Sequence, residues 1–153
     1  MAGLLIRLYQ IKDNISNTKM SNSILCTIDF SDTSKDVLTY AVNLARQFNN
    51  HITVLFTYRL LTSLNGEAVE VRKRMEERAR QDFSILEKEV LAGKGVSYDF
   101  KVEVGFVSNR VKEYAKNNGI TFLVMGKQMN ASNRESFDEL AENLHVPLLI
   151  VPN

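Results

Sequence analysis

An apolar run ends at a glycine in the stretch Thr121-Phe-Leu-Val-Met-Gly126, and polar residues follow from Lys127 onward. A short apolar run of this kind is typical of a strand that is buried on both faces, as strands of parallel sheets are. Ligands of open parallel sheets bind beyond the carboxyl ends of the strands. We therefore expect any small-molecule site to lie after Gly126 and at the matching end of the apolar run Ile24–Phe30.

Strand and helix patterns alternate along the rest of the chain. The predicted strands cover residues 24–30, 52–58, 96–104, 121–125 and 146–151. Helical spacing of apolar residues predicts a helix that starts after the cap residues Ser31–Ser34 and ends at Phe48, one long helix over 67–92, a short helix over 107–117, and a last helix over about 133–144. This order predicts an α/β protein with a doubly wound, five-stranded, mostly parallel sheet and helices on both faces.

Two segments are predicted to lie at the edges of that sheet. Residues 96–104 alternate strictly between apolar and polar side chains, which is typical of a strand with one wet face. The last strand contains the apolar run Leu148–Val151, and an edge of this kind must be covered in solution. Pairing with the same strand of a second copy predicts a C2 homodimer. The alternative is that the chain's own helices and N-terminal arm bury the strand.

Composition limits the class of protein and its partners. The chain has 153 residues with a formal net charge of +1, so no global field favours nucleic acid or an anionic membrane surface. We expect neither as a partner. No apolar run approaches the roughly 18 to 20 residues of a membrane helix. The single cysteine, Cys26, lies in an apolar strand and is interpreted as a small buried hydrophobe, which fits a reducing cytoplasm.

The chain is interpreted as an N-terminal arm and one domain. The arm covers residues 1–23, and the domain covers residues 24–153. Two alternatives stay open for residues 1–19, because Met20 comes just before the first regular strand. They are either an appended arm or the product of an upstream start codon.

Four segments together resemble the universal stress protein family. They are the first strand with Asp29-Phe-Ser-Asp-Thr-Ser34, the helix segment Leu38–Ala45, the stretch Arg110–Gly126 and the ending Val146–Val151, and the resemblance covers roughly residues 24–152. It implies the adenine nucleotide alpha hydrolase-like fold with strand order 3-2-1-4-5, a homodimer through the last strand, and a cytoplasmic, stress-linked role. Some members of the family bind ATP and others do not.

The residues that bind ATP in the family are only partly present. Asp29 matches the aspartate after the first strand, and Met125 with Gly126 matches the start of the pattern Gly-x2-Gly-x9-Gly-Ser/Thr. Met129 stands at the second glycine and Glu135 at the Ser/Thr, and no glycine follows Gly126. Four residues, 130–133, separate Met129 from Arg134 where the pattern has nine. A carboxylate among phosphate oxygens is electrostatically unfavourable.

Two hypotheses for the function follow. The first is a non-catalytic stress-response or regulatory module that acts through unknown protein partners and does not bind ATP in the family's usual manner. The second is a signalling module that binds ATP or another adenine nucleotide through Asp29, Met125, Gly126, Lys127 and Arg134. Asp29 itself has three alternative roles, as a local helix cap, a ligand contact or a phosphoacceptor.

The sequence shows no other chemistry. His51 and His145 lie near strand starts, at the end of the sheet opposite the expected ligand site, and form no metal set with Cys26. No base is near Ser31, Ser34 or Ser132 in the sequence, and there is no Gly-x-Ser-x-Gly elbow. We expect no catalytic residues, no metal and no resident cofactor.

Overall fold

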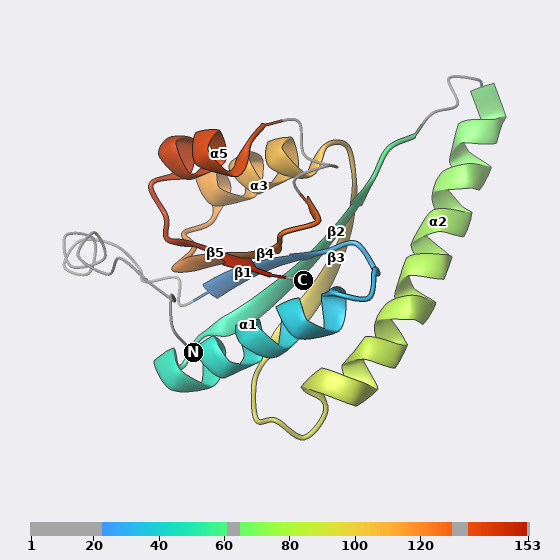
Figure 1. The fold of residues 1–153 in the computed structure, drawn as a ribbon. Coiled ribbons are helices and arrows are strands. Elements are labelled where there is room, and N and C mark those ends of the chain that lie inside the picture. The colour runs from blue at the N-terminus through green and yellow to red at the C-terminus, as the bar shows by residue number, and fades with distance from the viewer. Residues whose placement is uncertain (1–22, 61–64, 130–134, 153) are drawn as a thin grey trace.

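The computed structural model describes residues 23–60, 65–129 and 135–152, which form a single sheet with helices around it (Figure 1). The strands are β1 (Ser23–Ile28), β2 (His51–Tyr58), β3 (Tyr98–Val104), β4 (Phe122–Gly126) and β5 (Leu148–Val151). The helices are α1 (Ser34–Phe48), α2 (Asn65–Leu86) with its π-helical continuation η1 (Glu87–Leu91), α3 (Val107–Asn117) and α5 (Phe137–Leu144). The N-terminal arm, apart from Ser23, and Arg134 lie outside the described residues.

The five strands are parallel and follow the order β3-β2-β1-β4-β5. This confirms the predicted fold class and strand order. Ile24 of β1 lies between Ile52 of β2 and Phe122 of β4, so the most apolar strands occupy the centre of the sheet. The edges are β3 and β5, as the alternation in β3 and the terminal position of β5 predicted. Strand β3 begins at Tyr98, two residues later than expected.

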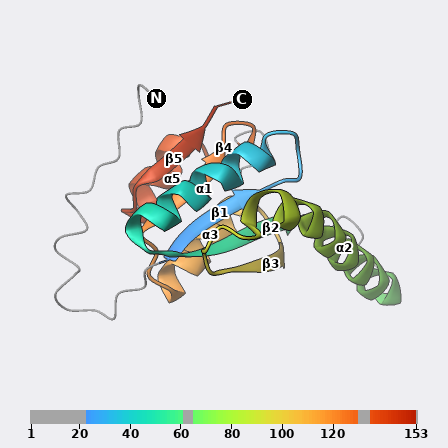
Figure 2. The ribbon, with the colours of Figure 1, turned by 90° about the horizontal axis from the view of Figure 1, so that it is seen from below.

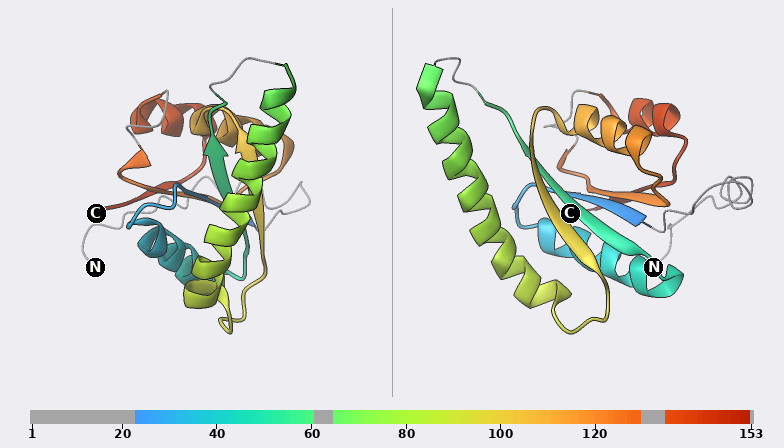
Figure 3. Two further views of the ribbon diagram at one scale, coloured as in Figure 1. Left: turned by 90° about the vertical axis from the view of Figure 1, so that its right-hand side faces the viewer. Right: turned by 180° about the vertical axis from the view of Figure 1, so that it is seen from behind.

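Helices cover both faces of the sheet and divide the core in two (Figure 3). On one face, α1 packs with Phe83 of α2 and with Val90 and Leu91 of η1 against β1 and β2. On the opposite face, α3 and α5 pack against Leu123 and Met125 of β4. Cys26 lies in the first cluster with no exposed surface, and its burial raises the pKa of the thiol. It is therefore the small buried hydrophobe that the sequence predicted.

Helix α1 begins within the predicted cap segment 31–34. Its N-cap residue is Thr33, although the Thr33 side chain makes no capping hydrogen bond to the helix. The carboxylate of Asp29 organises this turn instead. At the other end Asn49 adopts a left-handed conformation (φ 55°), and its N–H donates to the Ala45 carbonyl, which closes the helix as predicted.

The predicted long helix over residues 67–92 is present as one continuous helical segment, but it changes type before its end. The α-helix ends at Leu86, and the next five residues form the π-helix η1. Contacts with β3 fix this region, because the Phe83 ring stacks on Phe100 at 4.2 Å between centroids and Tyr98 Oη donates to Glu87 Oε2 at 2.6 Å. Hydrophobic spacing does not distinguish these two helix types. The opposite end of α2 projects away from the sheet (Figure 2), where Val69 is 68% exposed.

Helix α5 starts later than the sequence suggested. It begins at Phe137 rather than near residue 133, because Ser136 is its N-cap and accepts a hydrogen bond from Glu139 N–H at 3.2 Å. Its apolar residue Leu140 is fully buried. The residues between β4 and α5 that the structure describes are therefore a turn after Gly126 and the short approach from Glu135 to the cap.

Candidate functional site

The loops after β1 and β4 meet at the carboxyl end of the sheet, where the sequence placed the site. Asp29 comes directly after β1, and its Oδ1 accepts hydrogen bonds from Ser31 N–H (2.9 Å) and from Ser34 Oγ (3.1 Å). These bonds hold the chain in the turn that leads into α1. They support the interpretation of Asp29 as a local cap. Among the described residues its second oxygen, Oδ2, has no partner.

Hydroxyl and amide groups link the two loops. Thr33 Oγ1 shares a hydrogen bond with Ser31 Oγ at 2.9 Å and donates to Gln128 Oε1 at 3.3 Å. Gln128 belongs to the turn after β4, so this bond links the loop after β1 to the loop after β4. Thr33 and Gln128 were not predicted as site residues, because their contact joins positions 95 residues apart in the chain.

Gly126 has a packing role at this point. A Cβ atom there would lie 3.1 Å from Val37 Cγ2 and 3.5 Å from Thr33 Oγ1. Real side chains seldom approach so closely, and Val37 is itself buried in α1. The glycine therefore allows the first turn of α1 to approach β4, whether or not a ligand is present.

Met125 of β4 and Met129 of the turn after it belong to the core. Met125 is fully buried and Met129 is 4% exposed, and both lie in the cluster beneath α3 and α5 that includes Leu140. Met129 stands where the family resemblance placed a phosphate-binding glycine. Its side chain anchors the turn after β4 to the core, which a glycine could not do.

Glu135 makes polar contacts with two helices. Its Oε1 is paired with the ammonium of Lys112 on α3, and its Oε2 accepts from Asn143 Nδ2 of α5 at 3.1 Å. The hydrogen bond from Lys112, followed by that from Asn143, lowers the pKa of this carboxyl below its ordinary value, although partial desolvation opposes the shift. Glu135 is thus a negative charge in the loop region, and its partner cation is already engaged.

Of the two remaining predicted site residues, Lys127 and Arg134, the structure describes only Lys127. Lys127 has an exposed side chain, and its N–H donates to the Val151 carbonyl at 2.9 Å, which ties the start of the loop to β5. Arg134 lies outside the described residues. The structure therefore brings Asp29 and Gly126 to the same end of the sheet and leaves Lys127 as an exposed cation beside them.

The described residues contain neither a candidate metal centre nor a candidate membrane-spanning helix. In the ranges 23–60, 65–129 and 135–152, no three His, Cys, Asp or Glu side chains come together in a way that could hold a metal ion. Within the same ranges, no helix has the length and apolar character needed to cross a membrane.

The sheet is parallel with the order 3-2-1-4-5, an aspartate follows its first strand, and a glycine ends its fourth. These features define a class of doubly wound α/β proteins whose ligands bind at this carboxyl end. Comparison with family models narrows this class. The model of the universal stress protein family matches residues 20–152, and the chain belongs to that family. Among curated protein sequences, none matches significantly.

Solved structures show the same fold at low sequence identity. Universal stress protein UspA from Lactobacillus plantarum is 19% identical with a TM-score of 0.66, over 88% of this chain and 99% of that one. A universal stress protein from Archaeoglobus fulgidus in complex with dAMP is 15% identical with a TM-score of 0.53, over 85% and 94%. A family protein from Arabidopsis thaliana with AMP bound is 10% identical with a TM-score of 0.57, over 86% and 91%.

Proposed function

We propose that this chain is a non-catalytic, cytoplasmic regulatory module of the stress response, which acts through protein contacts and does not hold ATP in the manner usual for its family. The observation that carries the proposal is the state of the loop after β4. Met129, at the position of a phosphate-binding glycine, has its side chain in the core, and Glu135, at the position of a hydroxyl, holds a negative charge.

Both features work against a bound triphosphate. Phosphate oxygens in such loops need close approach to backbone N–H groups, which glycines permit and a buried, anchored methionine restricts. Lys112 on α3 already pairs with Glu135, so it contributes little positive charge to an incoming anion. The Thr33–Gln128 bond further links the two loops between which a nucleotide would enter.

Isothermal titration of the purified full chain with ATP, with and without Mg²⁺, tests the proposal. We expect no binding at micromolar concentration, and no adenine nucleotide among the small molecules released when the freshly purified protein is denatured. Micromolar binding or a co-purified nucleotide would contradict the proposal and direct attention to Asp29 and Gly126.

A second candidate function is binding of an adenine nucleotide in a different pose. Two observations favour it: Asp29 Oδ2 is without a partner among the described residues, and related structures contain AMP or dAMP. Backbone groups of Met125 and Gly126 and the cations Lys127 and Arg134 would complete such a site. AMP has one phosphate group rather than three, so it needs fewer hydrogen-bond donors from the loop than ATP does.

Titration with AMP separates the two functions when it is paired with variants. If the second function is correct, Asp29→Ala and Lys127→Gln weaken AMP binding, whereas Lys116→Gln, an exposed lysine on α3, leaves it unchanged. Wild-type protein that gives no heat with AMP, in a preparation that melts cooperatively, would leave the first function in place.

We also propose a homodimer through β5. The hydrogen bonds from Leu123 N–H to the Pro147 carbonyl and from Lys127 N–H to the Val151 carbonyl show that odd-numbered residues of this segment face β4. Backbone bonding directions alternate along a strand, so the N–H and C=O groups of Leu148 and Ile150 point to the open edge. A second β5 would satisfy them.

Light scattering on two variants tests this interface. Ile150→Pro removes an outward N–H, and we expect it to convert the dimer to a monomer because proline blocks strand pairing at an open edge. The control Ile150→Ala removes most of the same side chain but keeps the N–H, and it should remain dimeric. A monomeric wild-type protein at micromolar concentration would contradict the proposal.

A further inference from the structure

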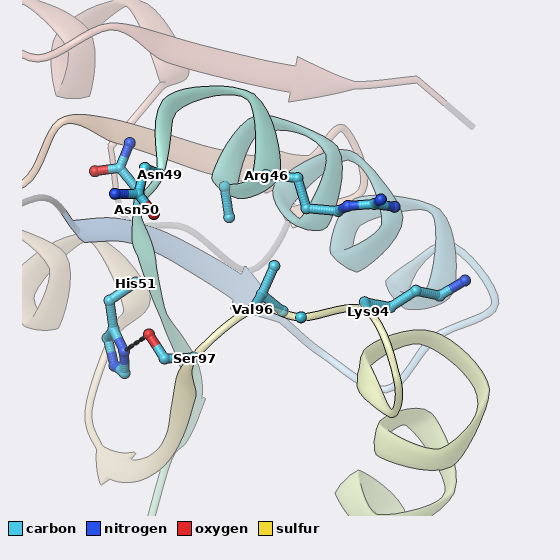
Figure 4. A pocket seen from close by; sticks show the side chains of 9 residues that line it. Arg46, Asn49, Asn50, His51, Lys94, Val96 and Ser97 are labelled. Carbon is cyan, nitrogen blue, oxygen red and sulfur yellow. Dashed lines mark hydrogen bonds between the residues drawn. The ribbon is translucent and has the colours of Figure 1, made fainter.

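Three polar side chains form a hydrogen-bonded row at the amino ends of β2 and β3, opposite the site described above. His51 Nδ1 lies 2.8 Å from Ser97 Oγ, and His51 Nε2 lies 2.8 Å from Asp99 Oδ1. The parallel register explains the contact, since Thr53 is paired with Asp99 and the residues two positions earlier are His51 and Ser97. Figure 4 shows the imidazole directed at the serine hydroxyl.

The proton positions in this row follow from its chemistry. An ionised carboxylate only accepts hydrogen bonds, so Asp99 requires the proton of the neutral imidazole to be on Nε2. Nδ1 is then a free base, and the Ser97 hydroxyl donates to it. Asp99 Oδ1 is held from its other side as well, because Thr53 Oγ1 donates to it at 2.9 Å and lies 3.0 Å from Tyr114 Oη.

The row opens on a pocket. Ser97 and His51 line a cavity of about 520 Å³ between the end of α1 and the residues before β3. Two cations line the same cavity, Arg46 and Lys94, and neither is in an ion pair within the part of the chain that the structure describes. Figure 4 places them on the side of the cavity away from His51. No Asp or Glu is among the lining residues.

We propose that Ser97 is an acyl-acceptor site, a nucleophilic serine that His51 activates and Asp99 orients. A hydroxyl hydrogen-bonded to a base that a third group positions is the general arrangement of an activated nucleophile. Ser97 Oγ attacks the carbonyl carbon of an acyl donor as its proton moves to His51 Nδ1. The bond from the acyl carbon to the leaving group then breaks, and the leaving group takes that proton. The product is an O-acyl serine, and no oxidant or second reactant is consumed.

The cavity points to the class of donor. Arg46 and Lys94 favour a small donor that carries negative charge, and an acyl phosphate combines that charge with a good leaving group. Both cations are exposed, so their preference for an anionic donor is about twofold to fivefold rather than larger. This inference concerns the opposite end of the sheet from the loop after β4 and does not depend on the proposed function.

Acetylation of the full chain provides the test, with acetyl phosphate as the anionic donor and p-nitrophenyl acetate as the neutral one. Both deliver the same acetyl group, and peptide mass mapping locates it. Hydroxylamine removes acetyl esters from serine but leaves acetyl-lysine intact, so it separates labelling of serines from labelling of lysines. Ser136, an exposed serine that caps α5 and has no histidine partner among the described residues, is the internal reference.

We expect Ser97 to be acetylated at least about tenfold more than Ser136, a modest share of what a positioned base can supply. His51→Gln and Asp99→Asn should each reduce the labelling of Ser97 toward the level of Ser136, and Arg46→Gln should reduce the preference for acetyl phosphate. Equal labelling of the two serines, or labelling of Ser97 that His51→Gln leaves unchanged, would overturn the proposal. A preference for acetyl phosphate that Arg46→Gln and Lys94→Gln do not alter would overturn the assigned donor class.

Discussion

The two ends of the sheet use polar residues in opposite ways. At the carboxyl end, Asp29, Thr33 and Gln128 bond to other groups of the same two loops, and Met129 anchors the turn to the core. At the amino end, Ser97 and His51 line a cavity together with Arg46 and Lys94, which form no ion pair with another described residue. The carboxyl end carries Asp29 and Gly126, which match part of the family's ATP-binding pattern. The amino end carries side chains that line a cavity.

This contrast predicts that substitutions at the two ends of the sheet differ in their effect on stability. Side chains that bond to one another at the carboxyl end contribute to stability, so substitutions there should be costly even without ligand. At the amino-end cavity Arg46, Lys94 and Ser97 are exposed, so substitutions of these three side chains should change stability little. The predictions below test the carboxyl-end side of this comparison, from the largest expected effect to the smallest.

Met129→Ala should lower the free energy of unfolding by about 2 to 4 kcal/mol, because it leaves a cavity beneath α3 and α5. Chemical denaturation measures the change. Lys127→Ala, two residues away and exposed, should change the same quantity by less than about 0.5 kcal/mol. An equal, small effect of both variants would show that the turn after β4 is not part of the core.

Gly126→Ala should cost about 1 to 3 kcal/mol of stability, since the new Cβ would approach Val37 Cγ2 at 3.1 Å. The second variant, Val37→Ala, removes that methyl group. Combined, the two substitutions should destabilise the protein by less than the sum of their separate effects, because the clash is absent. Strictly additive effects in urea denaturation would argue against the steric role of this glycine.

Asp29→Ala should lower the free energy of unfolding by about 1 kcal/mol without any ligand, through loss of the bonds from Ser31 N–H and Ser34 Oγ. Asp29→Asn keeps an acceptor oxygen and should cost less. If Asp29→Ala leaves the melting temperature unchanged and alters it only in the presence of AMP, the residue is a ligand contact rather than a cap.

Most of the fold could be predicted from the sequence, because hydrophobic periodicity records which faces are buried. The apolar runs gave the central strands, and the alternation from Val96 to Val104 gave the edge strand. The change to a π-helix at Glu87 could not be predicted in this way. It accompanies contacts with Tyr98 and Phe100 on β3, which are tertiary and leave no period in the helix sequence.

The candidate sites were less accessible to sequence reasoning. Asp29 and Gly126 could be identified because they end strands, but the link from Thr33 to Gln128 requires two loops to meet. His51 was placed correctly at the opposite end of the sheet. Its partners Ser97 and Asp99 were missed, because they are 46 and 48 positions away from it in the chain. The adjacency of the second and third strands, combined with their register, is the signal that could have found them.

The smallest predicted effect is a dependence of stability on pH through Glu135. Its folded pKa is lowered below the ordinary value of 4.5 by the hydrogen bond from Lys112, so the unfolded chain binds the proton more readily. The stabilising contribution is therefore fully present above pH 4.5 and is lost as the pH falls through the folded pKa. We expect this contribution to the free energy of unfolding to be less than about 1 kcal/mol, because Lys112 is partly exposed.

Urea denaturation of wild type and Glu135→Gln from pH 6 down to pH 3 measures this contribution. The stability difference between the two proteins should shrink over that range, and Lys112→Gln, which removes the main cause of the pKa shift, should weaken the dependence. A difference that stays constant across the range would show that the pair with Lys112 does not hold this carboxylate in its charged form.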